Sequence, residues 1–90
     1  MTSLDDSALD GNAIGGLLME VFGTEMTAAV AVCGSCGASG PMAETVVFLR
    51  APGTVVRCRS CGAVLMVVVR HRQQNCVDLL GLAALEPAVG

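Results

Sequence analysis

The first regular pattern of apolar residues lies near the N-terminus and has the spacing of one helix face. Its members, at i, i+3, i+4, i+7 and i+8, are Ile14, Leu17, Leu18, Val21 and Phe22. Asp10 precedes the pattern as a favourable N-cap, and Gly23 follows it as a natural helix stop. The pattern predicts an amphipathic helix at about 11–22.

The rest of the chain is rich in β-branched and apolar residues. Strands are expected at about 26–32, 45–50, 54–57, 64–69 and 76–80. Residues 51–53, Ala-Pro-Gly, have a type II turn signature, so the strands on either side are predicted to form a hairpin. Residues 39–41 are expected to be a loop and residues 73–75 a turn. The unbroken apolar run at 64–69 is typical of a central strand.

These elements predict one α+β domain, an antiparallel sheet with an N-terminal helix, over residues 9–82. Residues 1–8 are expected to be a disordered acidic lead, and residues 83–90 a loose tail. If the helix covers only one face of the 64–69 strand, the other face is an exposed apolar patch. Such a patch usually marks an interface, so a protein partner or a homodimer is expected.

Cysteine spacing is the strongest chemical signal in the chain. Four of the five cysteines form two C-x-x-C pairs, Cys33/Cys36 and Cys58/Cys61. Both pairs stand in the motif C-x-S-C-G-A, at residues 33–38 and 58–63. Two such turns can supply the four thiolates of a tetrahedral Zn²⁺ site, and glycine after the second cysteine tolerates positive φ. A full shell of thiolates predicts one structural zinc ion, with two disulfides or an iron–sulfur centre as the alternatives.

Composition supports a metal-stabilised fold. The 90-residue chain contains no Lys, Trp or Tyr and only two Phe, and its formal net charge is −3. A domain this small buries a modest core and usually needs an additional constraint, which zinc would supply. No apolar stretch is long enough to span a bilayer, and the acidic start differs from the basic start of a signal peptide. We expect a cytoplasmic protein with reduced thiols and no membrane partner.

Two resemblances follow from these motifs. Residues 27–72 resemble the zinc-ribbon superfamily, through both C-x-x-C-G turns and the hairpin between them. The ordered chain as a whole resembles a family of small bacterial proteins of unknown function. The residues that carry this second resemblance are 9–13, 21–23, 25–27, 49–57, 64–66 and the two cysteine motifs. It implies a zinc-binding ribbon with an N-terminal helix and implies no activity.

Charge is divided between the two halves of the chain. Residues 1–44 hold six acidic residues and no basic one, whereas residues 45–90 hold all the arginines. These arginines are Arg50, Arg57, Arg59, Arg70 and Arg72. One interpretation is a basic face that binds nucleic acid, as in a transcription-related ribbon. Alternatively, the arginines offset the charge of the metal site or pair with the acidic half.

The remaining reactive side chains give little indication of catalysis. Cys76 is expected to be a small buried hydrophobe, with a reactive thiol as the alternative. His71 is expected at a solvated strand end, with a ligand or nucleic-acid contact as the alternative. The chain holds no recognisable catalytic set, so we expect a non-enzymatic protein-interaction module with no small-molecule substrate. A nucleic-acid-binding ribbon and a thiol redox or metal-handling protein are the alternative functions.

Overall fold

The computed structural model describes residues 9–50 and 53–87, with the backbone alone at Arg50. Its helical elements are the 3-10 helices η2 (Gly11–Ile14) and η3 (Met42–Glu44) and the α-helix α1 (Gly15–Phe22). Its strands are β1 (Leu9–Asp10), β2 (Val30–Cys33), β3 (Ser39–Pro41), β4 (Val46–Arg50), β5 (Gly53–Arg57), β6 (Val64–His71), β7 (Gln74–Asp78) and β8 (Leu82–Glu86). The predicted α+β class is confirmed. The predicted acidic lead and the first two residues of the predicted turn at 51–53 lie outside the described residues.

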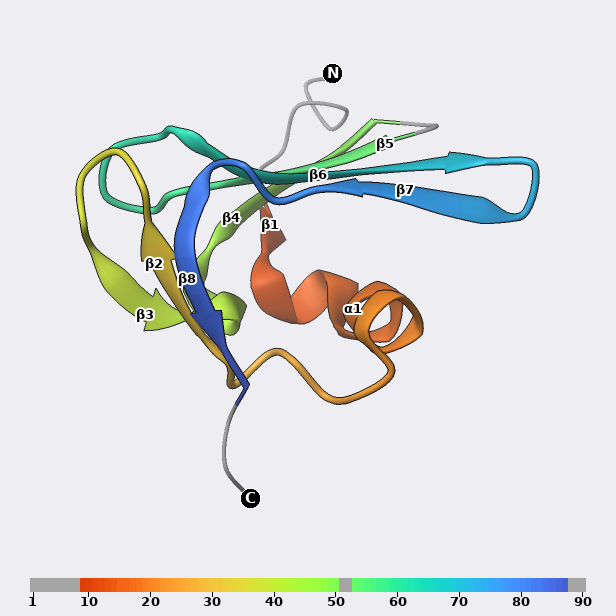
Figure 1. Cartoon of the computed structure of the whole chain (residues 1–90), viewed down its shortest axis with the longest axis horizontal. Helices are drawn as coiled ribbons and strands as arrows, with labels where there is room; N and C mark the ends of the chain where they lie inside the picture. The colour runs from red at the N-terminus through yellow and green to blue at the C-terminus, as the bar shows by residue number, and fades with distance from the viewer. Residues whose placement is uncertain (1–8, 51–52, 88–90) are drawn as a thin grey trace.

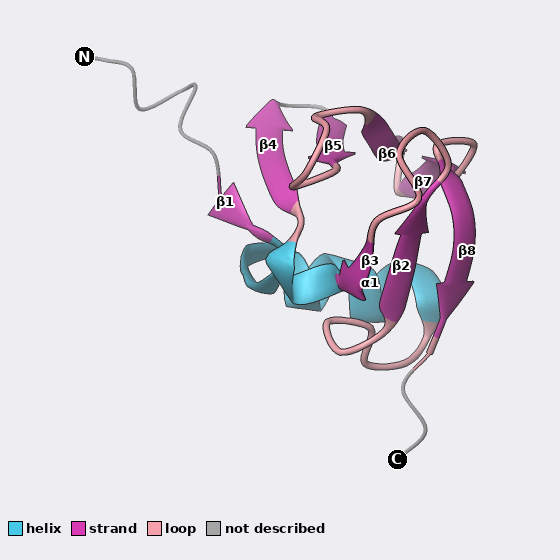
Figure 2. Cartoon of the chain, turned by 90° about the vertical axis from the view of Figure 1, so that its left-hand side faces the viewer, coloured by secondary structure: helices cyan, strands magenta, loops and turns pink. Residues whose placement is uncertain are grey.

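The strands form two antiparallel sheets. The larger sheet has the order β1-β4-β5-β6-β7, and the smaller has the order β3-β2-β8. Helix α1 lies below the larger sheet, with the smaller sheet beside it (Figure 1). Figure 2 shows the same arrangement from the side on which the β2–β3 and β5–β6 turns lie. The core therefore lies between one face of the larger sheet, the helix and the smaller sheet.

The predicted helix at 11–22 is confirmed, and its first turn is a 3-10 helix. The Asp10 side chain accepts a hydrogen bond from the Asn12 N–H at 3.1 Å, so Asp10 is the N-cap. Gly23 ends the helix with φ at +76°, and its N–H donates to the Met19 carbonyl at 2.7 Å. Both capping residues act as the sequence predicts.

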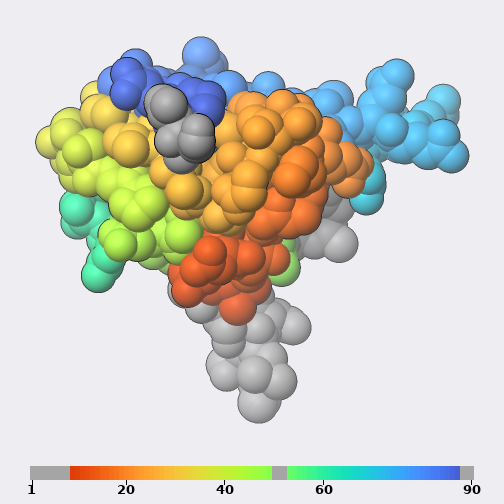
Figure 3. Space-filling model, turned by 90° about the horizontal axis from the view of Figure 1, so that it is seen from below, coloured from red at the N-terminus to blue at the C-terminus, as the bar shows by residue number. Residues whose placement is uncertain are grey.

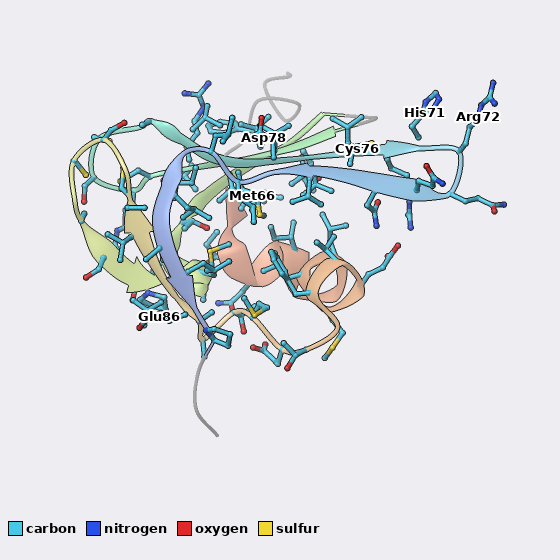
Figure 4. The ribbon with its side chains drawn as sticks, viewed as in Figure 1. Met66, His71, Arg72, Cys76, Asp78 and Glu86 are labelled. Atoms are coloured by element: carbon cyan, nitrogen blue, oxygen red, sulfur yellow. The ribbon has the colours of Figure 1, made fainter. Side chains whose placement is uncertain are left out.

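Strand register places apolar side chains in rows across the larger sheet. On the face toward the helix, Val47 pairs with Val56, and Val56 pairs with Met66. All three are at most 1% exposed, and Leu18 of α1 is fully buried in the same cluster. Figure 4 shows Met66 on the helix side of the sheet. This row anchors α1 to the sheet through burial of apolar surface.

The opposite face of the larger sheet is not covered by any described element. Here Phe48 pairs with Val55, and Val55 pairs with Val67, while Val69 pairs with Cys76 in the next row. We call these five residues the outer face. Phe48, Val55 and Val67 are half-buried and do not pack against the core cluster. Figure 4 shows Cys76 on the side of the sheet away from the helix. The helix thus covers only one face of the predicted 64–69 strand. This is the condition under which the sequence predicts an exposed apolar patch on the other face.

Two segments differ from their predicted structure because they complete the smaller sheet. Residues 39–41 were expected to be a loop, but they form β3 and pair with residues 30–32 of β2. Residues 83–90 were expected to be a loose tail, but Leu82–Glu86 forms β8 on the other side of β2. Since β2 has a partner on each side, its backbone hydrogen-bonding groups are satisfied within the fold.

Smaller differences concern element boundaries. The first predicted strand begins at Val30 rather than near residue 26, because residues 27–28 form a turn. The turn expected at 73–75 is centred on Arg72 and Gln73, whose φ values are +53° and +72°. It closes the β6–β7 hairpin, which projects beyond the body of the molecule (Figure 3). None of the described helices is long and apolar enough to cross a membrane.

Candidate metal centre

Two turns of matching geometry carry the four clustered cysteines. The first knuckle (residues 33–38) links β2 to β3, and the second knuckle (residues 58–63) links β5 to β6. In the first, the Gly37 N–H donates to the Cys33 carbonyl at 3.0 Å. In the second, the Gly62 N–H donates to the Cys58 carbonyl at 2.9 Å. The two glycines have φ values of +79° and +81°, so the repeated sequence motif produces a repeated backbone conformation.

The four sulfur atoms form a compact cluster in which every pair is within 4.8 Å. The distance from Cys33 Sγ to Cys61 Sγ is 3.7 Å, and the distance from Cys36 Sγ to Cys58 Sγ is also 3.7 Å. A tetrahedral ion with metal–sulfur bonds of ~2.3 Å requires sulfur–sulfur separations of about 3.8 Å. The cluster therefore has the size that one tetrahedral ion needs. All four cysteines are free thiols, so the structure contains neither of the alternative disulfides.

Backbone N–H groups point at the sulfur atoms in the same pattern in both knuckles. Cys33 Sγ accepts from the N–H groups of Ser35 and Cys36, at 3.3 and 3.5 Å. Cys58 Sγ accepts from the N–H groups of Ser60 and Cys61, again at 3.3 and 3.5 Å. Such donors stabilise negative charge on sulfur, and a thiolate is the form of cysteine that binds a metal. The knuckles are thus pre-organised for thiolates before an ion arrives.

The pKa of Cys36 is shifted in the opposite direction from the pKa values of Cys33 and Cys58. The N–H of Cys61, assisted by that of Ser60, lowers the pKa of Cys58 to about 6 despite burial. The N–H groups of Cys36 and Ser35 likewise lower the pKa of Cys33. For Cys36, the Ala38 N–H lowers the pKa, but burial and the neighbouring sulfur atoms outweigh this effect and raise it to about 11. Ionisation is therefore easier for Cys58 and Cys33 than for an ordinary thiol, whereas Cys36 must lose its proton when metal binds.

The cluster joins the two sheets of the molecule. Cys33 ends β2 in the smaller sheet, whereas Cys58 follows β5 in the larger sheet. These two ligands are buried, at 2% and 6% exposure, while Cys36 and Cys61 are exposed. The two turns lie side by side at the left of Figure 1, in yellow and teal. An ion bound here would cross-link sheet to sheet, with half of its ligand shell in the interior and half facing solvent.

A small hollow borders the cluster on the side of the buried ligands. Its volume is about 220 Å³, and its lining includes Cys33, Cys58 and Ser60. Glu44 and Arg59 also line it and are joined by an ion pair of 3.1 Å. The pair is exposed, so it contributes little to stability, and it places one positive side chain beside the cysteine cluster.

The arginines proposed as a basic face lie at two ends of the larger sheet. Arg57 and Arg59 lie at the end of the sheet beside the cysteine cluster, which we call the metal end. Arg50 lies at the far end of β4, opposite Gly53. Arg70 and Arg72 belong to the projecting β6–β7 hairpin, six or more residues along β6 from Val64, or roughly 20 Å. Arg59 pairs with Glu44, and Arg70 pairs with Glu20. The structure therefore separates these residues and joins two of them to the acidic half of the chain.

The remaining reactive residues lie away from the cysteine cluster. His71 is exposed at the end of β6, which confirms the predicted solvated strand end (Figure 4). Cys76 is exposed in β7, so the expectation of a buried hydrophobe is wrong. The predicted final strand begins at Gln74 rather than at Cys76, and its alternation places the thiol on the outer face.

Sequence reasoning missed Gly81, which lies between the two knuckles. Its carbonyl accepts a hydrogen bond of 2.9 Å from the N–H of Gly34 in the first knuckle. A Cβ atom added to Gly81 would lie 1.8 Å from the carbonyl oxygen of Val64, which follows the second knuckle. Only the absence of a side chain permits this approach. The single available signal was a glycine between the strand expected at 76–80 and the tail expected at 83–90.

Comparison with known proteins identifies the family but no activity. The model of the Family of unknown function (DUF6510) matches residues 5–90. The chain belongs to this family. No curated protein and no solved structure matches the chain. Membership of DUF6510 agrees with the predicted resemblance to a family of unknown function, while the resemblance to the zinc-ribbon superfamily stays a prediction.

Proposed function

We propose that this DUF6510 chain is a zinc-stabilised, non-enzymatic module that binds a protein partner through the outer face of its larger sheet. The observation that carries the proposal is the row Phe48–Val55–Val67, which is apolar and which the described elements leave uncovered. Exposed apolar patches of this kind are typical of interaction surfaces.

The chemistry of the donor set supports zinc as the ion. Four thiolates in a tetrahedral cluster suit Zn²⁺ or an iron–sulfur centre, and hard cations such as Mg²⁺ prefer oxygen ligands. Cys33, Cys36, Cys58 and Cys61 would fill the coordination shell of a single ion. Since catalytic zinc keeps an open position, a filled shell supports a structural role. Elemental analysis of purified protein tests this assignment, with one zinc per chain and no iron or inorganic sulfide as the expected result.

The proposed metal links the interaction surface to the rest of the fold. Cys58 immediately follows β5, which contributes Val55 to the outer face, and Cys61 leads into β6, which contributes Val67. Zinc would hold the ends of these strands against the smaller sheet. The module would thereby keep a firm sheet surface in a chain with few large side chains.

Affinity capture with matched variants tests the interaction role. Val67→Lys places a charge on the outer face, whereas Leu80→Lys places one on a residue that is 91% exposed elsewhere. We expect a protein partner, which includes a second copy of the chain, to bind the unmodified protein and Leu80→Lys but not Val67→Lys. Recovery of nucleic acid alone, or equal capture by both variants, would contradict the proposal. Zinc content measured in parallel confirms that each variant is folded.

A further inference from the structure

Two charged side chains border the apolar row of the outer face on opposite sides. Arg57 of β5 lies at the metal end of this face, with its guanidinium carbon 5.9 Å from the centre of the Phe48 ring. Asp78 of β7 pairs with Val67 and lies on the same face, away from the helix (Figure 4). Both side chains are exposed. We propose that the outer face binds the same face of a second copy of this chain, with Arg57 of each copy paired to Asp78 of the other.

The register of the strands sets the distance between the two charges within one chain. Strands β5 and β7 are separated by β6, and Arg57 pairs with Val64 while Asp78 pairs with Val67. Two strand spacings and three residues correspond to about 14 Å between their backbones. That separation is too large for an ion pair within the chain. Within the chain, Arg57 instead donates to the Gly62 carbonyl at 2.9 Å, and Asp78 accepts from the Leu80 N–H at 2.9 Å. Both side chains nevertheless stay exposed, so each can also meet an opposite charge on a partner.

A twofold symmetric contact satisfies both charges at once. In such an interface the same patch is used by both subunits, so a contact from one residue to another is repeated in reverse. The required twofold axis lies in the plane between the two sheets, midway between Arg57 and Asp78 and perpendicular to the line that joins them. It places Arg57 of each copy opposite Asp78 of the other. Packed sheets lie ~10 Å apart, which an arginine and an aspartate can span together. One positive and one negative group on either side of an apolar row are thus self-complementary.

The size of the face sets the expected strength of this dimer. Four strands about 4.8 Å apart, each about five residues long, give a flat area of roughly 320 Å² per copy. Stable interfaces bury about 800 Å² per partner. We therefore expect a weak dimer that forms in the micromolar range and dissociates on dilution or, because of its ion pairs, at high salt.

The inferred dimer rests on the proposed use of the outer face as a binding surface. Exchanging the two charges by mutation tests it. Sedimentation of the zinc-loaded protein over a concentration series measures the dimer fraction. Arg57→Glu and Asp78→Arg should each weaken dimerisation by about tenfold or more, and the double variant Arg57→Glu/Asp78→Arg should restore it. Arg72→Glu, in the hairpin turn outside the face, is the matched control and should not change it. Zinc content shows whether a variant at Arg57, which also donates to the Gly62 carbonyl, retains the second knuckle.

The possible results separate this inference from the broader proposal. A protein that stays monomeric at millimolar concentration, or a double variant that fails to dimerise, would overturn the symmetric pairing. If a different protein is captured and lost with Val67→Lys, the outer face is a binding surface but its partner is not a second copy. Failure of both experiments would overturn the interaction role itself.

Discussion

The N–H of Gly34 donates a hydrogen bond to the carbonyl of Gly81, which ties the first knuckle to the turn between β7 and β8. Gly81 also packs closely against the backbone at the start of β6, because a Cβ atom added to it would overlap the Val64 carbonyl. The chain thus crosses from the larger sheet to the smaller one directly beside the cysteine cluster. This crossing and the four cysteines together form the junction of the two sheets.

Substitution of Gly81 tests the importance of the crossing. A Cβ atom at this position would lie 1.8 Å from backbone oxygen and 2.7 Å from the Leu65 Cα, so the strands must separate. We expect Gly81→Ala to lower the free energy of unfolding by about 3 kcal/mol or more. Thermal unfolding followed by circular dichroism measures the change. Gly16→Ala is the control, because a Cβ atom there meets nothing within 4 Å. Alanine is favoured over glycine within a helix by about 1 kcal/mol, so this variant should be no less stable than the unmodified protein.

Truncation of Met66 tests the packing of α1 against the larger sheet. Met66 is 1% exposed and lies in the same row as Val47 and Val56. Met66→Ala leaves a cavity and should cost about 2–5 kcal/mol of unfolding free energy. Val69→Ala removes side-chain volume on the outer face, where 37% of the residue is exposed, and should cost less than about 1 kcal/mol. Denaturant titration of the metal-loaded protein compares them, and equal losses would contradict the assignment of the two faces.

Acid should release the metal. Protons compete with the ion for thiolate sulfur, and the pKa of Cys58 is lowered to about 6. The Cys58 thiolate therefore remains ionised at neutral pH, and retention of the ion should fall as the pH drops below 6. Equilibrium dialysis over pH 4–8 measures this retention. Retention unchanged at pH 4 would be inconsistent with thiolate ligands.

Metal binding at pH 7 should also release protons, because the pKa of Cys36 is raised to about 11. Calorimetry in buffers of different ionisation enthalpy detects this release.

The projecting hairpin should respond locally to loss of its contact with the helix. Glu20 accepts hydrogen bonds from Arg70 and from the Asn75 side chain, and both partners lie on the β6–β7 hairpin. These groups are exposed, so Glu20→Gln should lower global stability by less than about 1 kcal/mol. Its main effect should be faster hydrogen exchange near residues 70–75. Glu86→Gln, in β8, removes a charge elsewhere and should leave that exchange unchanged. A large global loss from Glu20→Gln would mean that the contact supports the core.

The cysteine cluster was predictable from the sequence because its geometry is local. Each C-x-x-C-G turn brings two sulfur atoms together within a few residues, and both positive-φ glycines could be assigned by inspection. The helix was predictable for a similar reason, since Asp10 and Gly23 mark its ends on either side of an apolar stripe. Patterns of this kind need no knowledge of distant parts of the chain.

The smaller sheet was not predictable because its strands depend on a partner. Residues 39–41, Ser-Gly-Pro, and 82–86, Leu-Ala-Ala-Leu-Glu, have weak strand preferences. They become strands because β2 lies between them and supplies hydrogen bonds to both. Gly81 was overlooked for the same reason, because its close contact is with a backbone 17 positions earlier in the chain. The arginines do not gather on one face, because Arg57 lies over Phe48 on the outer face whereas Arg70 pairs with Glu20 of the helix.

X-ray absorption at the metal edge of the purified protein tests the central claim most directly. The account predicts one zinc ion per chain with four sulfur neighbours at about 2.3 Å. Variant Cys58→Ser should reduce the number of sulfur neighbours or abolish binding, whereas Cys76→Ser should leave the spectrum unchanged. A shell with fewer than four sulfur atoms in the unmodified protein, or protein without metal that keeps the same fold and stability, would contradict the account.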